Sequence, residues 1–120
     1  MLTPFGKEVR KLRIDQGLSL KDMATAIGVS SAYISAVETG KKNITDELVL
    51  SICKILHIDA EQMQERMKEL AEASKDKVSI DLDGRCEKRR EVAAVFARNF
   101  DKFDSNDLDS FLNILRDKNR

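Results

Sequence analysis

The chain has 120 residues, of which 42% are hydrophobic, 35% charged and only 5% aromatic. This length suits one compact domain, or a small domain with an appendage. No apolar run approaches the roughly 18 residues needed to cross a bilayer, and the N-terminus lacks the basic-then-apolar layout of a signal peptide, so we expect a cytoplasmic protein with no membrane contact. The formal net charge is zero, but residues 1–57 carry eight Lys or Arg against six Asp or Glu, and the rest of the chain leans slightly acidic.

Polar caps, glycines and apolar spacing predict five helices in the first 73 residues. Helix-capping residues precede each of them: Thr3, followed by a first-turn proline, and Ser19, Ser30, Thr45 and Asp59. Glycines are expected to end the first three helices: Gly17, Gly28 and Gly40. Apolar side chains at helical spacing define the expected buried face. They are Phe5, Val9, Leu12, Ile14, Leu20, Met23, Ala24, Ile27, Ile34, Val37, Leu48, Ile52, Ile55, Leu56, Met63, Met67 and Leu70.

The pattern changes after Ala73. Residues 78–82 alternate between apolar and polar side chains and end at Asp83-Gly84, which fits a short strand or an extended linker, and we favour the linker. From residue 85 two further helices are expected, forming a hairpin. Four of the five phenylalanines lie in residues 96–111, which is more apolar surface than two short helices can cover. We therefore expect this hairpin to dimerise through Phe96, Phe100, Phe103, Leu108, Phe111, Leu112 and Leu115.

The stretch from Leu20 to Val37 has the spacing of a helix-turn-helix. A small residue, Ala24, allows a second helix to cross close to the first, and Gly28 provides the turn four residues later. The aliphatic residues at the expected crossing are Met23, Ile27, Val29, Ile34 and Val37. This arrangement would leave the outer face of residues 30–39 free to enter a DNA major groove.

The segment GLSLKDMATAIGVSSAYISAVETGKKNIT, residues 17–45, resembles the phage-repressor-type (Xre, Cro-like) helix-turn-helix family. The resemblance covers about the first 70 residues and rests on the spacing, the turn glycine and the Glu-x-Gly-Lys-Lys exit. It implies an all-α, five-helix, lambda-repressor-like domain that binds operator DNA as a two-fold dimer. The tail from about residue 74 resembles no family.

Carried over by position, the resemblance places Ser31, Ala32 and Ser35 against base edges. Serine can donate to or accept from several bases, and an alanine methyl can touch the thymine methyl group. No Gln, Asn or Arg stands there to form bidentate pairs, so DNA shape and bridging water are expected to carry more of the specificity. The resemblance also implies contacts to the DNA backbone from Arg13, Ser19, Lys21, Ser30, Tyr33, Lys41, Lys42 and Asn43.

Structural roles compete with several of these assignments. Helix capping alone explains Ser19 and Ser30, and Tyr33 could be a half-buried packing residue. Lys41 and Lys42 could belong to an ordinary solvated loop. Arg13 and Glu38 either form an ion pair that orients the arginine beside the DNA backbone or a surface pair of little energetic value. The basic cluster at residues 88–90 is interpreted as a solvated face rather than a second nucleic-acid contact.

Nothing in the sequence favours an enzyme or a cofactor site. The single histidine, His57, ends the expected fourth helix, and no metal-binding or phosphate-binding motif accompanies it. Cys53 and Cys86 are too few for a disulfide framework or a zinc site, and we interpret both as small buried residues. We expect no catalytic residues, no metal and no cofactor.

Together these patterns predict a helix-turn-helix DNA-binding domain at residues 1–73, a linker or short strand at 74–84 and a dimerising helical hairpin at 85–120. The favoured hypothesis is a dimeric repressor that presents two recognition helices, about 34 Å apart, to a near-palindromic operator. One alternative is an antitoxin-type protein that represses its operon and binds a partner protein, such as a toxin, through the Phe-rich tail. Another is a helix-turn-helix fold that serves only protein contacts.

Overall fold

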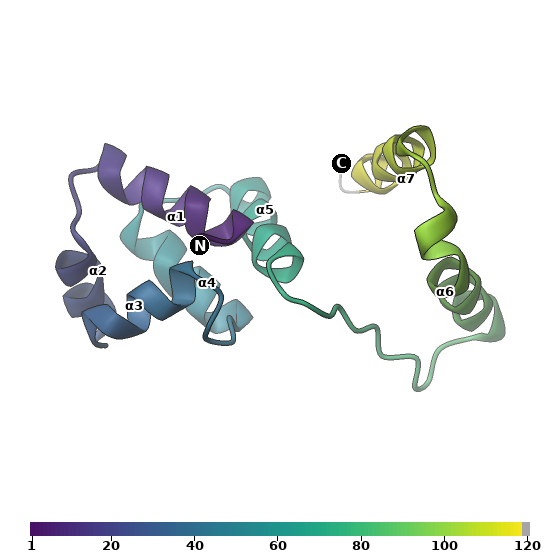
Figure 1. Ribbon diagram of the computed structural model, residues 1–120, viewed down its shortest axis with the longest axis horizontal. Helices are drawn as coiled ribbons and strands as arrows, with labels where there is room; N and C mark the ends of the chain where they lie inside the picture. The colour runs from purple at the N-terminus through teal and green to yellow at the C-terminus, as the bar shows by residue number, and fades with distance from the viewer. Residues whose placement is uncertain (119–120) are drawn as a thin grey trace. The chain divides into compact units, whose positions relative to one another are not determined.

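A computed structural model describes residues 1–118, which contain seven α-helices, one short 3-10 helix and no strand (Figure 1). The chain divides into two units, residues 1–78 and residues 79–120. The first unit holds α1 (Pro4–Asp15), α2 (Leu20–Ile27), α3 (Ser31–Glu38), α4 (Asp46–Ile55) and α5 (Glu61–Ala73). The second holds α6 (Glu87–Asn99), η1 (Phe100–Lys102) and α7 (Ser105–Asp117). The predicted all-α class is confirmed.

Four of the five predicted caps form as expected. The side-chain oxygens of Thr3, Ser19, Ser30 and Thr45 each accept a hydrogen bond from a backbone N–H in the first turn of the following helix. The prediction for Asp59 was wrong, because α5 begins at Glu61 after Ala60 and has no side-chain cap. The N-cap position is held by Ala60, whose methyl group cannot accept a hydrogen bond, and Asp59 lies one residue too early.

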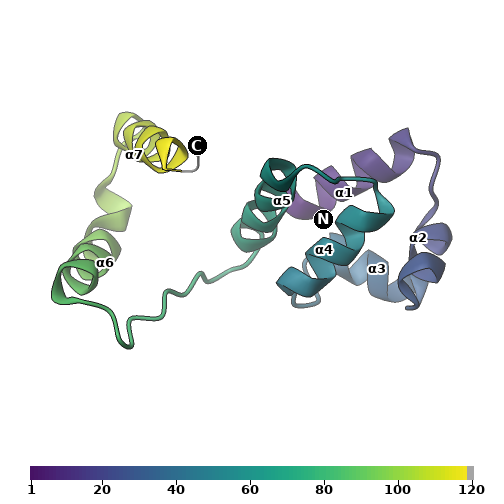
Figure 2. The same cartoon turned by 180° about the vertical axis from the view of Figure 1, so that it is seen from behind.

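The first unit packs around a single hydrophobic core. Helix α1 contacts α3 and α5, α2 contacts α3 and α4, and α4 contacts α5, so that α2 and α5 lie at opposite ends of the unit (Figures 1 and 2). The buried side chains include nine of the predicted core residues: Phe5, Val9, Met23, Ala24, Ile34, Val37, Ile52, Leu56 and Met67. None of the helices within residues 1–118 is both long and apolar enough to span a bilayer.

Burial was predicted wrongly at two apolar positions, where Ile14 and Met63 are 59% and 44% exposed. Ile14 lies on α1 about 140° around the helix from the buried Val9, so it points away from the core. Met63 shares a face with the buried Met67, but it lies one turn earlier, at the start of α5, where the other helices do not cover it. Side chains that were not predicted fill core positions instead: Ile44, Val49 and Ala71.

The two cysteines differ in burial. Cys53 is the small buried residue that was expected, whereas Cys86 is exposed, so the prediction for Cys86 was wrong. Cys86 precedes α6 in a unit that has no buried residue between positions 79 and 118. Nothing in that unit is therefore enclosed enough to bury a thiol.

The second unit is held together by aromatic rings rather than by a core. The Phe96 ring centroid lies 5.6, 5.3 and 5.8 Å from those of Phe100, Phe103 and Phe111, and the Phe103 and Phe111 centroids are 4.8 Å apart. Residues 78–82, which lie between α5 and α6, form no strand, in line with the favoured alternative. The last two residues of the predicted hairpin, 119–120, lie outside the described residues.

Candidate nucleic-acid interface

The turn between α2 and α3 is built on Gly28. This residue has a φ of 89°, and its N–H and that of Val29 both donate to the Ala24 carbonyl, at 2.8 and 2.9 Å. A Cβ at Gly28 would meet no neighbouring atom, so the left-handed backbone, and not a lack of space, requires glycine there. Ser30 then starts α3, its Oγ accepting from the Tyr33 N–H at 3.1 Å.

Helix α3 buries one face and exposes the other. Ile34, Val37 and Glu38 are buried in the first unit. The three residues expected to face base edges are all exposed: Ser31, Ala32 and Ser35. The exposed face carries only hydroxyl and methyl groups, so it offers hydrogen bonds and apolar contacts to bases but no charge.

The predicted pair of Arg13 and Glu38 is present, but it is buried. Arg13 Nε lies 3.3 Å from Glu38 Oε2, and the two side chains are only 9% and 5% exposed. A second guanidinium nitrogen, Nη1, donates to the Leu18 carbonyl at 3.0 Å. The alternative of a weak surface pair is therefore wrong. Arg13 joins α1, the end of α3 and the loop before α2, and it holds the fold instead of extending outward.

A second contact, which sequence reasoning missed, fixes the end of α3 against the start of α1. The Thr3 N–H and hydroxyl both donate to the Glu38 carbonyl, at 3.2 and 3.3 Å. A Cβ built on Gly6 would overlap that carbonyl oxygen, so α1 and α3 touch backbone to backbone at this point. The only sign of this contact in the sequence was Gly6 itself, because a glycine inside a predicted helix costs about 1 kcal/mol relative to alanine and so suggests a close approach.

The N-termini of α2 and α3 differ in charge. Asp22 accepts from the Ser19 N–H at 2.9 Å, and this hydrogen bond, with a second from the Ser19 side chain, lowers the pKa of Asp22. A carboxylate therefore occupies the positive end of α2, where it would repel a phosphate. The first turn of α3 has no acidic residue. The N-terminus of α3, capped by Ser30, therefore suits an anion better than the N-terminus of α2, capped by Ser19.

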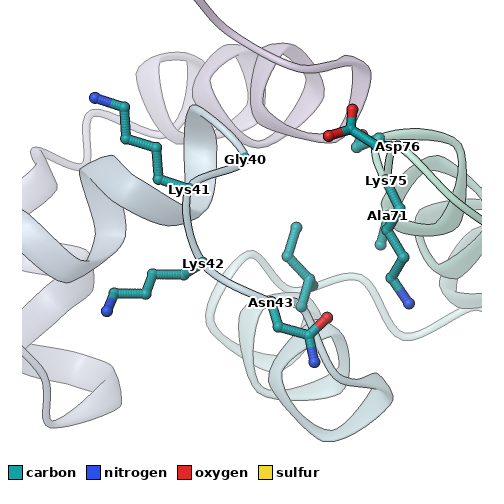
Figure 3. Close-up of a pocket in the computed structure, with 9 residues that line it drawn as sticks. Gly40, Lys41, Lys42, Asn43, Ala71, Lys75 and Asp76 are labelled. Atoms are coloured by element: carbon teal, nitrogen blue, oxygen red, sulfur yellow. The ribbon is translucent and has the colours of Figure 1, made fainter.

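The loop after α3 is exposed and basic. Lys41, Lys42 and Asn43 are all exposed, and within residues 1–118 no carboxylate pairs with either lysine. A shallow pocket of about 210 Å³ separates this loop from Lys75 and Asp76 after α5. Both loop lysines extend away from that pocket toward solvent (Figure 3). Their ammonium groups are therefore free to meet an external anion.

The remaining candidates divide between exposed and packed positions. Lys21 is exposed on α2, whereas Tyr33 is half-buried and packs partly against the core. His57 is exposed just after α4 and has a φ of 58°. Among residues 1–118, no three His, Cys, Asp or Glu side chains lie close enough together to hold a metal ion.

This geometry defines a helix-turn-helix module, and comparison with known proteins agrees. The sequence profile of the family described as helix-turn-helix matches residues 9–63. The chain is 33% identical over 76 residues to the transcriptional regulator ClgR of Mycobacterium tuberculosis, in strains CDC 1551 / Oshkosh and H37Rv, an alignment covering 58% of this chain and 68% of ClgR. It is 32% identical over 87 residues to the uncharacterized HTH-type transcriptional regulator RghRB of Bacillus subtilis strain 168, covering 66% of this chain and 63% of RghRB. No solved structure matches the chain.

The chain belongs to the helix-turn-helix family. The matched residues contain the whole of α2, Gly28 and α3. The resemblance drawn from the sequence is thereby confirmed for the first unit.

Proposed function

We propose that this protein is a sequence-specific DNA-binding transcriptional regulator that binds a near-palindromic operator as a dimer and represses transcription. The exposed outer face of α3, opposite its buried Ile34 and Val37, is the observation that carries the proposal. Membership of the helix-turn-helix family and the likeness to ClgR and RghRB, both of which are named transcriptional regulators, support it.

The proposed readout lies on one short helix. Ser31 and Ser35 donate to or accept from base edges in the major groove, and the Ala32 methyl contacts a thymine methyl. Because no side chain on this face can form a bidentate pair with a base, each contact discriminates only weakly between bases. The proposal therefore includes specificity from DNA shape and bridging water.

Phosphate contacts position this helix in the groove. Lys41, Lys42 and Asn43 neutralise or bind phosphates on one side, and the start of α3 at Ser30, with the Tyr33 hydroxyl, binds the backbone on the other. Lys21 adds a further charge from α2. Ser19 and Arg13 have weaker claims, since Asp22 stands beside Ser19 and Arg13 is buried.

A dimer would present two such helices about 34 Å apart, one turn of B-DNA, so that each reads one half of the operator. A dimer bound over a promoter would exclude polymerase, and repression follows from that occlusion.

The exposed apolar residues of the second unit favour one further candidate, an antitoxin-type protein whose α6 and α7 cover a partner protein such as a toxin. Purification of the chain alone separates the two. A stable homodimer without exposed apolar surface supports the plain regulator, and a sticky tail that becomes protected only when a partner protein is added supports the antitoxin.

Selection of bound sequences from a random DNA pool tests the proposed function. The account expects two related half-sites separated by one helical turn. The double variant Ser31→Ala with Ser35→Ala should change the preferred bases, whereas Ser51→Ala, an exposed serine on α4, should leave them unchanged. An unenriched pool would contradict the proposal.

A further inference from the structure

An open groove lies along α6 in the second unit. It has a volume of about 830 Å³, and its floor is apolar, formed by Val92, Ala93 and Phe96 of α6 with Leu115 of α7. Val92 and Leu115 are 61% and 60% exposed. Large apolar side chains left this exposed are available for burial against a partner.

The rim of this groove is basic. Arg85, Lys88 and Arg89 line it, against a single acidic residue, Asp81. Lys88 also lies 3.8 Å from Glu91, but both side chains are highly exposed, and such a pair is too weak to neutralise the lysine. An apolar floor with a positive rim fits an amphipathic helix that carries carboxylates beside its apolar face.

Helix α7 is such a helix. Asp104, Asp107 and Asp109 stand at its start, where negative charge also suits the helix dipole. The apolar face bears Leu108 and Leu112, which are 41% and 49% exposed, next to Leu115, which is 60% exposed and also lines the groove of its own copy. Phe111 packs against Phe96 and Phe103 of its own copy, and this packing leaves the three leucines uncovered.

We propose that the groove of each copy receives α7 of a second copy, with the acidic first turns of that α7 against Arg85, Lys88 and Arg89. The exchange is reciprocal, so one two-fold axis relates two identical contacts, as in a closed dimer. The inference rests on the proposed function in one respect, because such a dimer would hold together the two DNA-binding domains of that proposal. Its physical basis is confined to residues 79–118.

Charge reversal in the full-length chain tests this exchange. A groove variant, Lys88→Glu with Arg89→Glu, would set an acidic rim against an acidic α7. A helix variant, Asp107→Asn with Asp109→Lys, would cancel the net negative charge at the start of α7, because the new lysine balances the remaining Asp104, and the new amide at position 107 keeps an oxygen that can accept from the Asp104 N–H. Each variant alone should self-associate about tenfold more weakly, because the groove variant sets like charges against each other at both contacts and the helix variant removes the attraction from both.

Mixing the two variants should favour a heterodimer over either homodimer, because one of its two contacts is then the wild-type pairing of a basic rim with an acidic α7. Sedimentation velocity and native mass spectrometry measure the association. A matched pair of single charge reversals on α6 provides the control. Arg89→Glu, in the groove lining, should weaken the dimer, whereas Arg98→Glu, outside the lining, should not.

The proposal is overturned if the wild-type chain is monomeric at high micromolar concentration, if each variant alone remains as dimeric as wild type, or if the mixture stays monomeric. It is also overturned if the groove variant keeps its dimer and loses affinity for a single DNA half-site, since the rim would then serve phosphates. Half-site binding by all variants is measured separately, so loss of DNA binding by the wild type would contradict the proposed function and leave the dimer result intact.

Discussion

Gly6 of α1 and Glu38 of α3 are in direct backbone contact, so close that a Cβ at Gly6 would overlap the Glu38 carbonyl oxygen. That carbonyl also accepts two hydrogen bonds from Thr3. The recognition helix is therefore fixed at its C-terminal end by the first turn of α1, while the Gly28 turn fixes its N-terminal end. Orientation of its outer face depends on both.

The variant Gly6→Ala should destabilise the first unit by about 1–3 kcal/mol, because the added methyl group forces α1 away from α3. In an exposed helix the same change would stabilise by up to about 1 kcal/mol. Urea unfolding followed by circular dichroism measures the difference. Lys7→Ala, one residue further on and exposed, is the control and should be near neutral. An unchanged or higher stability for Gly6→Ala would contradict the close approach.

Arg13 and Glu38 should behave as a coupled buried pair. Arg13→Met removes the partner of a carboxylate that is 5% exposed, and loss of one member of a buried pair costs about 3–5 kcal/mol. The double variant Arg13→Met with Glu38→Leu should recover much of that loss, since no charge then remains buried. Equilibrium unfolding of the two single variants and the double variant gives the coupling energy. Additive effects would show that the two side chains act independently.

Stability should fall in acid in part through Asp22. Its pKa is held below the ordinary value of 3.8, chiefly by the Ser19 backbone N–H. A depressed pKa in the folded state contributes stability above pH 3.8 that disappears as the pH falls through the lower, folded-state value. Asp22→Asn should therefore lower stability at about pH 6 and have less effect near about pH 3. NMR titration of the Asp22 carboxyl checks the cause, and a midpoint at or above 3.8 would refute it.

The loop lysines should set part of the salt dependence of DNA binding. If Lys41 and Lys42 each neutralise one phosphate, replacing both with alanine should reduce the slope of log affinity against log salt by about 1.8. Fluorescence anisotropy over a range of salt concentrations measures the slope. Lys54→Ala, exposed at the end of α4, is the control. A slope that does not change in the double variant would mean that the loop does not touch the backbone.

Most of the helices could be predicted from residues that lie close together in the sequence. Helix caps and the Gly28 turn depend on residues three or four positions apart, so the sequence alone predicted them correctly for Thr3, Ser19, Ser30 and Thr45. The prediction for Asp59 failed because α5 begins one residue later than expected, with Ala60 at the N-cap position. Ile14 and Met63 failed because an apolar side chain on a helix is buried only if another helix covers that part of its surface.

Contacts between distant residues could not be predicted in the same way. Thr3 and Glu38 are 35 positions apart, and only the packing of α1 on α3 brings them together. The resemblance supplied the Arg13–Glu38 pair but not its burial, which depends on the surrounding helices. Cys86 is exposed because α6 and α7 enclose no core, and composition does not reveal that.

The central claim is that the outer face of α3 enters the DNA groove, and a carboxylate placed on that face tests it most directly. Ser35→Glu should lower affinity for the selected operator by about 100-fold or more while leaving thermal unfolding unchanged, because the new charge would face base edges and phosphates. Ser51→Glu, exposed on α4, should have little effect. Wild-type affinity in a folded Ser35→Glu variant would contradict the account.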